Sequence, residues 1–199
     1  MVVKQTLIKV LIVASSALFA ISAQANLIVN GGFEDAAIVN GWSYGAENGW
    51  SGDNVEVWHG FGGIGAYEGV RHAELNAHGN TNGGAFSIHQ TFSTVVGKVY
   101  NLFFAYGARR STEEAFDVDV TGSATMNFTN HEVNKWSTYS GNFEATSEET
   151  TLSFTSVTPY SGTVGNFLDD IRVTVPEPGS LALFGLGLIG LVAARRKAK

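Results

Sequence analysis

Hydrophobic and polar side chains alternate with a period of two along much of the chain. The alternation is clearest in three segments, in which large apolar residues occupy every second position: 86–92, 100–106 and 116–120. Shorter segments at 152–154 and 171–173 repeat it. Because successive side chains of a β-strand point to opposite faces, this pattern predicts strands that are buried on one side. No stretch between residues 26 and 174 sustains a helical period, so we expect an all-β domain.

Turn-forming residues separate the strand segments. Glycine and asparagine cluster between the strand segments, for example at 31–32, 62–63 and 80–84. Turns about every 10 residues are typical of an antiparallel β-sandwich. The segment 26–174 has a usual size for one domain and is long enough to bury a core. The chain contains no cysteine, so packing or a bound metal must take the place of disulfides.

The first 25 residues have the parts of a secretory signal peptide. Lys4 and Lys9 lead into an almost wholly apolar run at 10–21, and small residues at 23–25 form a cleavage motif. The apolar run is shorter than the roughly 20 residues that a spanning helix needs. We therefore expect residues 1–25 to form a signal helix, and the mature chain to begin at Asn26.

Residues 175–199 combine an extended segment, an apolar run and a basic end. Two prolines at 176 and 178 favour an exposed, non-helical segment that a membrane-bound enzyme can reach. The uncharged run at 181–194 reaches some 20–25 Å as a helix, against roughly 30 Å of hydrocarbon. The basic cluster after it favours the cytoplasmic side of a membrane. A transmembrane helix here is therefore marginal in length, and it leaves the domain outside.

This order closely resembles the PEP-CTERM sorting signal. The residues that carry the resemblance are Pro176, Glu177, Pro178, Arg195 and Arg196. The resemblance implies an exosortase-type processing enzyme as partner and a Gram-negative host that exports polysaccharide. It also implies an intermediate in the inner membrane, followed by the cell surface or the extracellular matrix. A plain C-terminal membrane anchor is the alternative, and it differs only in whether the tail is retained.

The segment 26–174 is strongly acidic, with 17 acidic and six basic residues and a net charge of −11. Binding of nucleic acid or anionic lipid depends on neutralising phosphates with Lys and Arg, so neither is an expected partner. Cations and neutral ligands fit this charge better. A solvated acidic surface explains most of the carboxylates without any ligand.

A second resemblance covers the whole predicted domain. Five segments carry it: NLIVNGGFE at 26–34, FSIHQTFST at 86–94, KVYNLFFAYGAR at 98–109, KWSTYSGNFEAT at 135–146 and NFLDDIRV at 166–173. With Trp42, they resemble jelly-roll domains of the galactose-binding-like fold, among them several carbohydrate-binding module families. The resemblance implies the fold more than a particular ligand, because one fold hosts many functions.

The two ends of such a jelly roll lie side by side, which predicts that Glu34 and Asp169 approach each other. If Ile171 and Val173 face the core, alternation turns Asp169 inward and Asp170 outward. A buried carboxylate needs a partner. In related modules that partner is often a structural calcium ion, which here implies Glu34, Asp169 and Asp170 as ligands. The alternative is that Asp169 accepts backbone hydrogen bonds in a turn.

The segment 42–76 is the predicted ligand site, because aromatic residues lie among polar ones there. Aromatic faces over polar groups suit sugar rings. The candidate ligand residues are Trp58, Tyr67, Arg71, His72 and Glu74. Alternation in the strand around Trp58 turns it outward, whereas Trp42 and Trp136 are expected in the core. The alternative is that Trp58 is also a core residue.

No sequence motif indicates catalysis, and we expect no catalytic residues. The five histidines form no HExxH set for zinc, and no GxSxG nucleophile motif is present. Acidic residues are numerous, but any acidic sandwich offers carboxylate pairs. The sequence therefore predicts an exported, non-catalytic β-sandwich protein that binds glycan or a polysaccharide matrix. The alternatives are a structural matrix component without a specific ligand and a small glycan-active hydrolase.

Overall fold

The computed structural model describes residues 25–38, 40–60, 63–77, 84–129 and 131–176. The predicted signal helix and the predicted C-terminal transmembrane helix lie outside these residues. In the described part of the chain, no helix is long and apolar enough to cross a membrane. Chain contacts group Asn26–Val175 into one unit.

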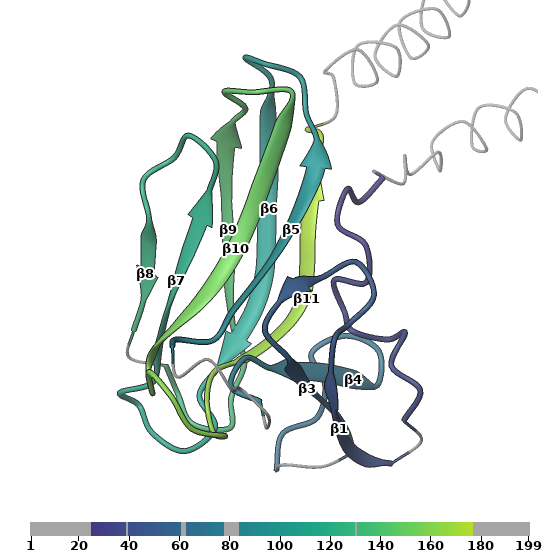
Figure 1. Ribbon diagram of the computed structural model, residues 1–199, viewed down its shortest axis with the longest axis vertical. Helices are drawn as coiled ribbons and strands as arrows, with labels where there is room; N and C mark the ends of the chain where they lie inside the picture. Colours follow the sequence, from purple (N-terminus) through teal and green to yellow (C-terminus); the bar gives the residue numbers. More distant parts are fainter. Residues whose placement is uncertain (1–24, 39, 61–62, 78–83, 130, 177–199) are drawn as a thin grey trace, which may run out of the picture. The chain divides into compact units, whose positions relative to one another are not determined.

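Two antiparallel sheets make up this unit (Figure 1). One sheet has six strands in the order β1-β3-β4-β11-β6-β9, with bounds Gly41–Gly45, Val55–His59, Arg71–Glu74, Phe167–Thr174, Val99–Gly107 and Ser137–Glu144. The other has five strands in the order β2-β5-β10-β7-β8, with bounds Ser51–Gly52, Ser87–Ser93, Glu149–Thr158, Ala115–Val120 and Met126–Phe128. The predicted all-β class with antiparallel sheets is confirmed.

The core lies between the two sheets, and residues predicted from the period of two line it. Leu102 and Phe104 of β6 point into it, as do Phe116 of β7 and Phe154 of β10. The ring centroid of Phe104 lies 5.2 Å from that of Phe154 and 6.2 Å from that of Phe116, both edge-on. Each such side chain contributes about 1.5–3 kcal/mol by leaving water. This shared core holds the sheets face to face.

The two ends of the unit run side by side, as the resemblance to jelly-roll termini implies. Leu27 donates its backbone N–H to the carbonyl of Val173 at 2.8 Å, and Ile171 donates to Gly31 at 3.0 Å. The Asn26 Oδ1 atom accepts a hydrogen bond from Val173 N at 2.9 Å. A Cβ atom at Gly31 would lie 2.0 Å from the Ile171 carbonyl oxygen, so this approach requires glycine.

Candidate functional site

Aromatic side chains from three neighbouring strands lie in register on the outer face of the six-stranded sheet. The register pairs Trp42 of β1 with Trp58 of β3, and Trp58 with His72 of β4. Ring centroids are 6.4 Å apart in the first pair and 6.5 Å in the second, with interplanar angles of 28° and 10°. Val55 and Val57 occupy the alternate positions of β3 and belong to the core. The three rings therefore lie on the side away from the core.

The line of rings continues beyond β4. The His72 ring contacts Trp136 at 5.6 Å, and the Trp136 ring contacts Tyr67 at 6.2 Å, both edge-on. The indole N–H of Trp136 donates to the carbonyl of Gly65 at 2.7 Å, which fixes its orientation. We call these five residues the aromatic row: Trp42, Trp58, His72, Trp136 and Tyr67.

Only the two ends of the aromatic row are well exposed. Trp42 is 41% exposed and Tyr67 43%, whereas Trp58 and His72 are each 1% exposed. Trp58 thus faces outward, as alternation predicts, but it is covered and does not reach solvent, whereas the predicted core position of Trp42 is wrong. The reason is that β3 lies between β1 and β4 and is covered on both faces, while β1 is an edge strand. The guanidinium of Arg109 lies 4.5 Å from the Trp58 ring centre and forms part of that cover.

Trp136 also departs from its predicted core position. It is half-buried and packs against His72 and Phe167 on the outer face. Tyr44, two residues after Trp42 on β1, is 51% exposed. Its ring centroid lies 6.1 Å from that of Trp42, with an interplanar angle of 26°. The edge strand therefore presents two neighbouring aromatic side chains to solvent.

A buried carboxylate lies beside the aromatic row. Glu74 of β4 is fully buried and pairs in register with Glu56 of β3, which is also buried. Arg109 donates from Nη1 to both oxygens of Glu74, at 2.9 and 2.8 Å, and Gly165 N donates at 2.7 Å. Burial nevertheless raises the pKa of Glu74 to about 8, and the nearby Glu56 adds to this.

His72 is a buried neutral base. Burial lowers its pKa to about 4, and its Nε2 atom has no hydrogen-bond partner among the described residues. The imidazole is therefore held by ring contacts with Trp58, Trp136 and Phe167. The imidazole is therefore in its neutral form at neutral pH.

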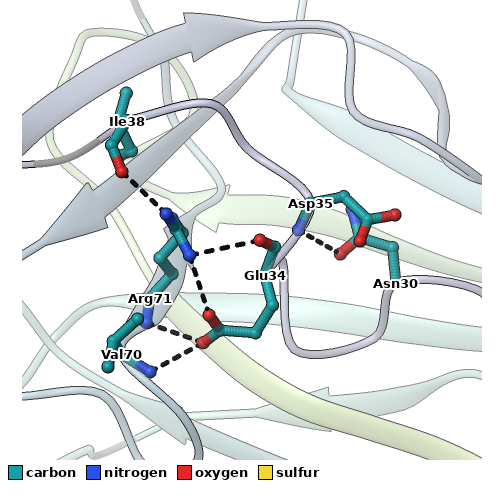
Figure 2. A network of polar contacts seen from close by, with 6 residues as sticks. All are labelled: Asn30, Glu34, Asp35, Ile38, Val70 and Arg71. Atoms are coloured by element: carbon teal, nitrogen blue, oxygen red, sulfur yellow. Dashed lines mark hydrogen bonds and ion pairs between the residues drawn. The ribbon is translucent and has the colours of Figure 1, made fainter.

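Arg71, a predicted ligand residue, binds Glu34 (Figure 2). Its Nη1 atom lies 3.0 Å from Glu34 Oε2, and Nη2 donates to the carbonyl of Ile38 at 2.7 Å. The other Glu34 oxygen, Oε1, accepts the backbone N–H groups of Val70 and Arg71 at 2.7 and 2.8 Å. Glu34 thereby joins the N-terminal segment to the start of β4.

Asp169 is buried, but it lies on the outer face of the sheet and not in the core. A β-bulge between Asp169 and Arg172 inserts one residue, so Leu168 and Ile171 both face the core while Asp169 does not. Asp170 at the bulge has a positive φ of 48°. The predicted inward direction of Asp169 is therefore wrong, because simple alternation does not hold through a bulge.

The Asp169 carboxylate binds the same loop that Glu34 binds. Its Oδ2 atom accepts the backbone N–H groups of Tyr67 and Glu68 at 2.7 and 3.1 Å, and Oδ1 accepts that of Asp170 at 2.6 Å. Burial raises the pKa of Asp169 to about 7, although these donors oppose the shift. Asp170 forms an ion pair with Arg172 at 2.8 Å.

Calcium fits this donor set only in part. Carboxylates are the right ligand type, and a side chain at Gly32 would meet Glu34, Glu68 and Asp169 within 4 Å. However, the Arg71 cation lies on Glu34, and backbone N–H groups occupy the oxygens of Glu34 and Asp169. Among the described residues, no three acidic or histidine side chains are grouped as metal ligands. Calcium binding stays a prediction, and the geometry favours the alternative of a hydrogen-bonded turn.

The candidate ligand residues do not include Trp42, Tyr44 or Arg109, although Trp42 and Tyr44 lie within the predicted segment 42–76. Alternation in GWSYG does place Trp42 and Tyr44 on one face, but it does not reveal that β1 is an edge strand. Arg109 follows β6 in sequence and reaches Glu74 and Trp58 only through the fold. The ligand-binding role of Trp58, Tyr67, Arg71, His72 and Glu74 stays a prediction.

Comparisons with known proteins agree with both resemblances. Residues 66–174 match the model described as "Protein of unknown function (DUF642)", and residues 174–197 match the PEP-CTERM protein-sorting motif. The predicted sorting motif is thus confirmed. It indicates an exported protein of a Gram-negative bacterium that is sorted through the exosortase pathway. Comparison with curated proteins gave no match.

Solved structures resemble the sandwich at low sequence identity. A cyclase from Fischerella sp. TAU has a TM-score of 0.57 and 17% identity, over 77% of this chain and 98% of that chain. TmCBM61 in complex with beta-1,4-galactotriose has a TM-score of 0.51 and 16% identity, over 76% of this chain and 99% of that chain. At this identity the likeness shows the fold alone, which is that of carbohydrate-binding module jelly rolls.

Proposed function

We propose that this chain, which belongs to the DUF642 family, is an exported, non-catalytic protein that binds neutral polysaccharide through the exposed aromatic residues of its six-stranded sheet. The observation that carries this proposal is the aromatic row, which is exposed at Trp42 and at Tyr67, together with the exposed Tyr44 beside Trp42 on the edge strand. The sorting motif supports it, because it indicates export and therefore access to extracellular polymers.

The chemistry of the exposed rings suits carbohydrate. Pyranose rings offer apolar C–H patches edged by hydroxyl groups, and aromatic faces pack against such patches. Trp42 and Tyr44 come from one strand and lie 6.1 Å apart between centroids. Trp42 also stacks on the buried Trp58 at 6.4 Å, and Arg109 covers Trp58. An extended chain can therefore contact more than one ring of a preformed surface.

The opposite outer face of the sandwich has a different chemistry. The outward positions of β5, β10 and β7 hold Ser, His, Thr and Asp: Ser87, His89, Thr91, Thr151, Ser153, Thr155, Asp117 and Asp119. Several of these bind one another, as in the Ser87–Thr155 and Thr91–Thr151 pairs at 3.0 and 2.8 Å. Such a self-satisfied polar face is an ordinary solvated surface. The six-stranded sheet is thus the favoured binding side.

The carboxylates beside the aromatic row do not favour a hydrolase. A glycosidase needs two carboxyl groups that reach the substrate from either side of the bond. Glu56 and Glu74 are both buried, and Glu74 is bound by Arg109 and Gly165. The described geometry therefore supports binding over hydrolysis.

Affinity electrophoresis of the exported protein in gels that contain neutral polysaccharides tests the proposal. Each sugar-ring contact contributes on the order of 1 kcal/mol, so a single site is weak and gains from multivalent display. The double variant Trp42→Ala, Tyr44→Ala is expected to lose most of its retardation. Tyr160→Ala is the matched control, because Tyr160 is 59% exposed and lies outside the aromatic row. Equal mobility of the double variant and the wild type in a retarding gel would refute the site, and absence of retardation in every gel would favour a matrix component without a specific ligand.

A further inference from the structure

A groove lies between two loops that contain none of the residues of the aromatic row. One wall is the connection from β6 to β7 and the other is the connection from β10 to β11. The groove has a volume of about 420 Å³, with Arg110, Ser111, Glu113, Pro159 and Ser161 among its lining residues. This volume falls within the usual range of about 300–1,000 Å³ for ligand sites.

Both walls of the groove are held in place by buried groups. Glu114, which is buried, accepts the backbone N–H groups of Arg109, Arg110 and Ser111 at 2.7, 2.8 and 3.1 Å. On the other wall, the Pro159 carbonyl accepts hydrogen bonds from Asn76 Nδ2 at 3.1 Å and from Ser156 Oγ at 2.6 Å. The backbone of the groove is therefore preorganised, which reduces the entropy lost on binding.

Arg110 differs from the other arginines of the sandwich. Arg71, Arg109 and Arg172 each pair with a carboxylate, at 3.0, 2.8 and 2.8 Å. Within the described ranges, the Arg110 guanidinium has no carboxylate at ion-pair distance, although the domain carries 17 acidic residues. Glu114 is close in sequence, but backbone N–H groups occupy its oxygens. The groove thus presents an available cation in an acidic protein.

We propose that this groove binds a uronic-acid unit of a polysaccharide, with Arg110 pairing with the sugar carboxylate. The guanidinium presents two parallel N–H donors that match a planar carboxylate. Hydroxyl groups of Ser111 and Ser161 are suited to the sugar hydroxyls, and the apolar surface of Pro159 is suited to its C–H groups.

Glu113 restricts the charge of the ligand. It also lines the groove, and within the described residues its side chain has no ion-pair partner. One cation and one neighbouring anion suit a sugar unit with a single carboxylate, whose hydroxyl groups can donate to Glu113. A doubly charged phosphate meets more repulsion from Glu113 than a carboxylate does. The charges of Arg110 and Glu113 distinguish this groove from the uncharged aromatic surface.

Calorimetric titration of the full chain with digalacturonate tests the proposal, with the neutral digalactose as matched ligand. We expect digalacturonate to bind and digalactose to bind at least about 10-fold more weakly, because one charge-assisted pair is lost. Arg110→Gln is expected to weaken digalacturonate binding by about 10- to 100-fold, and Arg110→Lys by less. Lys98→Gln removes an exposed positive charge outside the groove and is the control variant, which leaves this binding unchanged. The groove is tested with a charged ligand and the aromatic row with neutral polysaccharide, so failure of one site is distinguishable from failure of the other.

Glu113→Gln is expected to change the affinity for digalacturonate in the opposite direction. Removal of its charge is expected to tighten digalacturonate binding several-fold, which loss of folding cannot imitate. Equal binding of digalactose, unchanged binding by Arg110→Gln, or equally tight binding of galactose 6-sulfate would each overturn the assignment to a uronic acid.

Discussion

His72 is the residue whose protonation most directly opposes folding. Its pKa is about 4 in the folded protein against an ordinary value of 6.5. Its ring neighbours Trp58, Trp136 and Phe167 carry no charge that could hold a proton on it. The unfolded chain therefore binds a proton between these pH values that the folded chain does not bind.

We predict that protonation of His72 destabilises the protein as the pH falls below 6.5. The contribution of His72 is complete above pH 6.5 and is lost as pH falls toward 4, by up to about 3 kcal/mol in the free energy of unfolding. Urea denaturation at pH 7 and pH 4.5 measures this loss, and His72→Phe is expected to show a smaller one. An identical pH dependence in the variant would contradict the burial of a neutral imidazole.

The titration of Asp169 changes stability with pH in the opposite direction from that of His72. The pKa of Asp169 rises from 3.8 to about 7 on folding, so its contribution is complete below pH 3.8 and is lost as pH rises through 7. A calcium ion at this carboxylate would reverse that preference, because metal ligands bind in the ionised form.

The jelly-roll resemblance predicts that calcium stabilises the protein through Glu34, Asp169 and Asp170. At 100 times its dissociation constant, calcium would add about 2.7 kcal/mol, or several degrees in Tm. Thermal melts of metal-stripped protein with calcium and with a chelator measure the difference, and Asp169→Ala is expected to remove it. Superimposable wild-type melts would leave Asp169 as the acceptor for the Tyr67 and Glu68 amides.

At the scale of elements, β1 and β3 show how position in the sheet changes the meaning of the same pattern. Both strands alternate, with Trp42 and Trp58 in register on one face. β1 is an edge strand, and its Trp42 is exposed; β3 is internal, and its Trp58 is covered by Arg109. The sequence of each strand predicts the face of its tryptophan but not the cover over that face.

This difference predicts opposite roles for the two tryptophans. Trp58→Ala is expected to lower the free energy of unfolding by about 3–5 kcal/mol, because it leaves a cavity under Arg109. Trp42→Ala is expected to cost less than about 1 kcal/mol, because its side chain is largely solvated. Urea denaturation at neutral pH measures both. A larger loss of stability for Trp42→Ala than for Trp58→Ala would contradict the burial of Trp58 and the exposure of Trp42.

At the scale of the whole molecule, export and sorting frame the function of the sandwich. The sorting motif spans residues 174–197 and begins at the last residue of β11. β11 is held on both sides, by β4 and β6, and its end is bonded to the N-terminal segment. Removal of the residues after Val175 therefore leaves the strands of both sheets intact.

We predict that the mature protein begins at Asn26 and ends within residues 175–180 in a host with an exosortase. Intact-mass measurement of protein recovered from the cell surface checks both ends. The comparison strain lacks the exosortase, and in it the tail is expected to be retained. Recovery of the tail through Lys199 from the wild-type host would show an ordinary membrane anchor.

The sequence by itself determined the all-β class, the alternating core of β5, β6, β7 and β10, and the sorting motif. These features depend on local patterns: a period of two selects the strand, and a linear motif is read in order by its processing enzyme. Each is therefore visible in a short window of residues such as 100–106.

Only the tertiary structure decided which side chains of the candidate site reach solvent. Trp58 is buried because two other strands and Arg109 surround it, and Asp169 turns to the outer face because one extra residue enters β11. Arg110 is available because the fold brings no carboxylate of the described residues to it, whereas it pairs the other three arginines of the sandwich with acids. Exposure depends on contacts between residues far apart in sequence, and a local period carries no information on what lies above a strand.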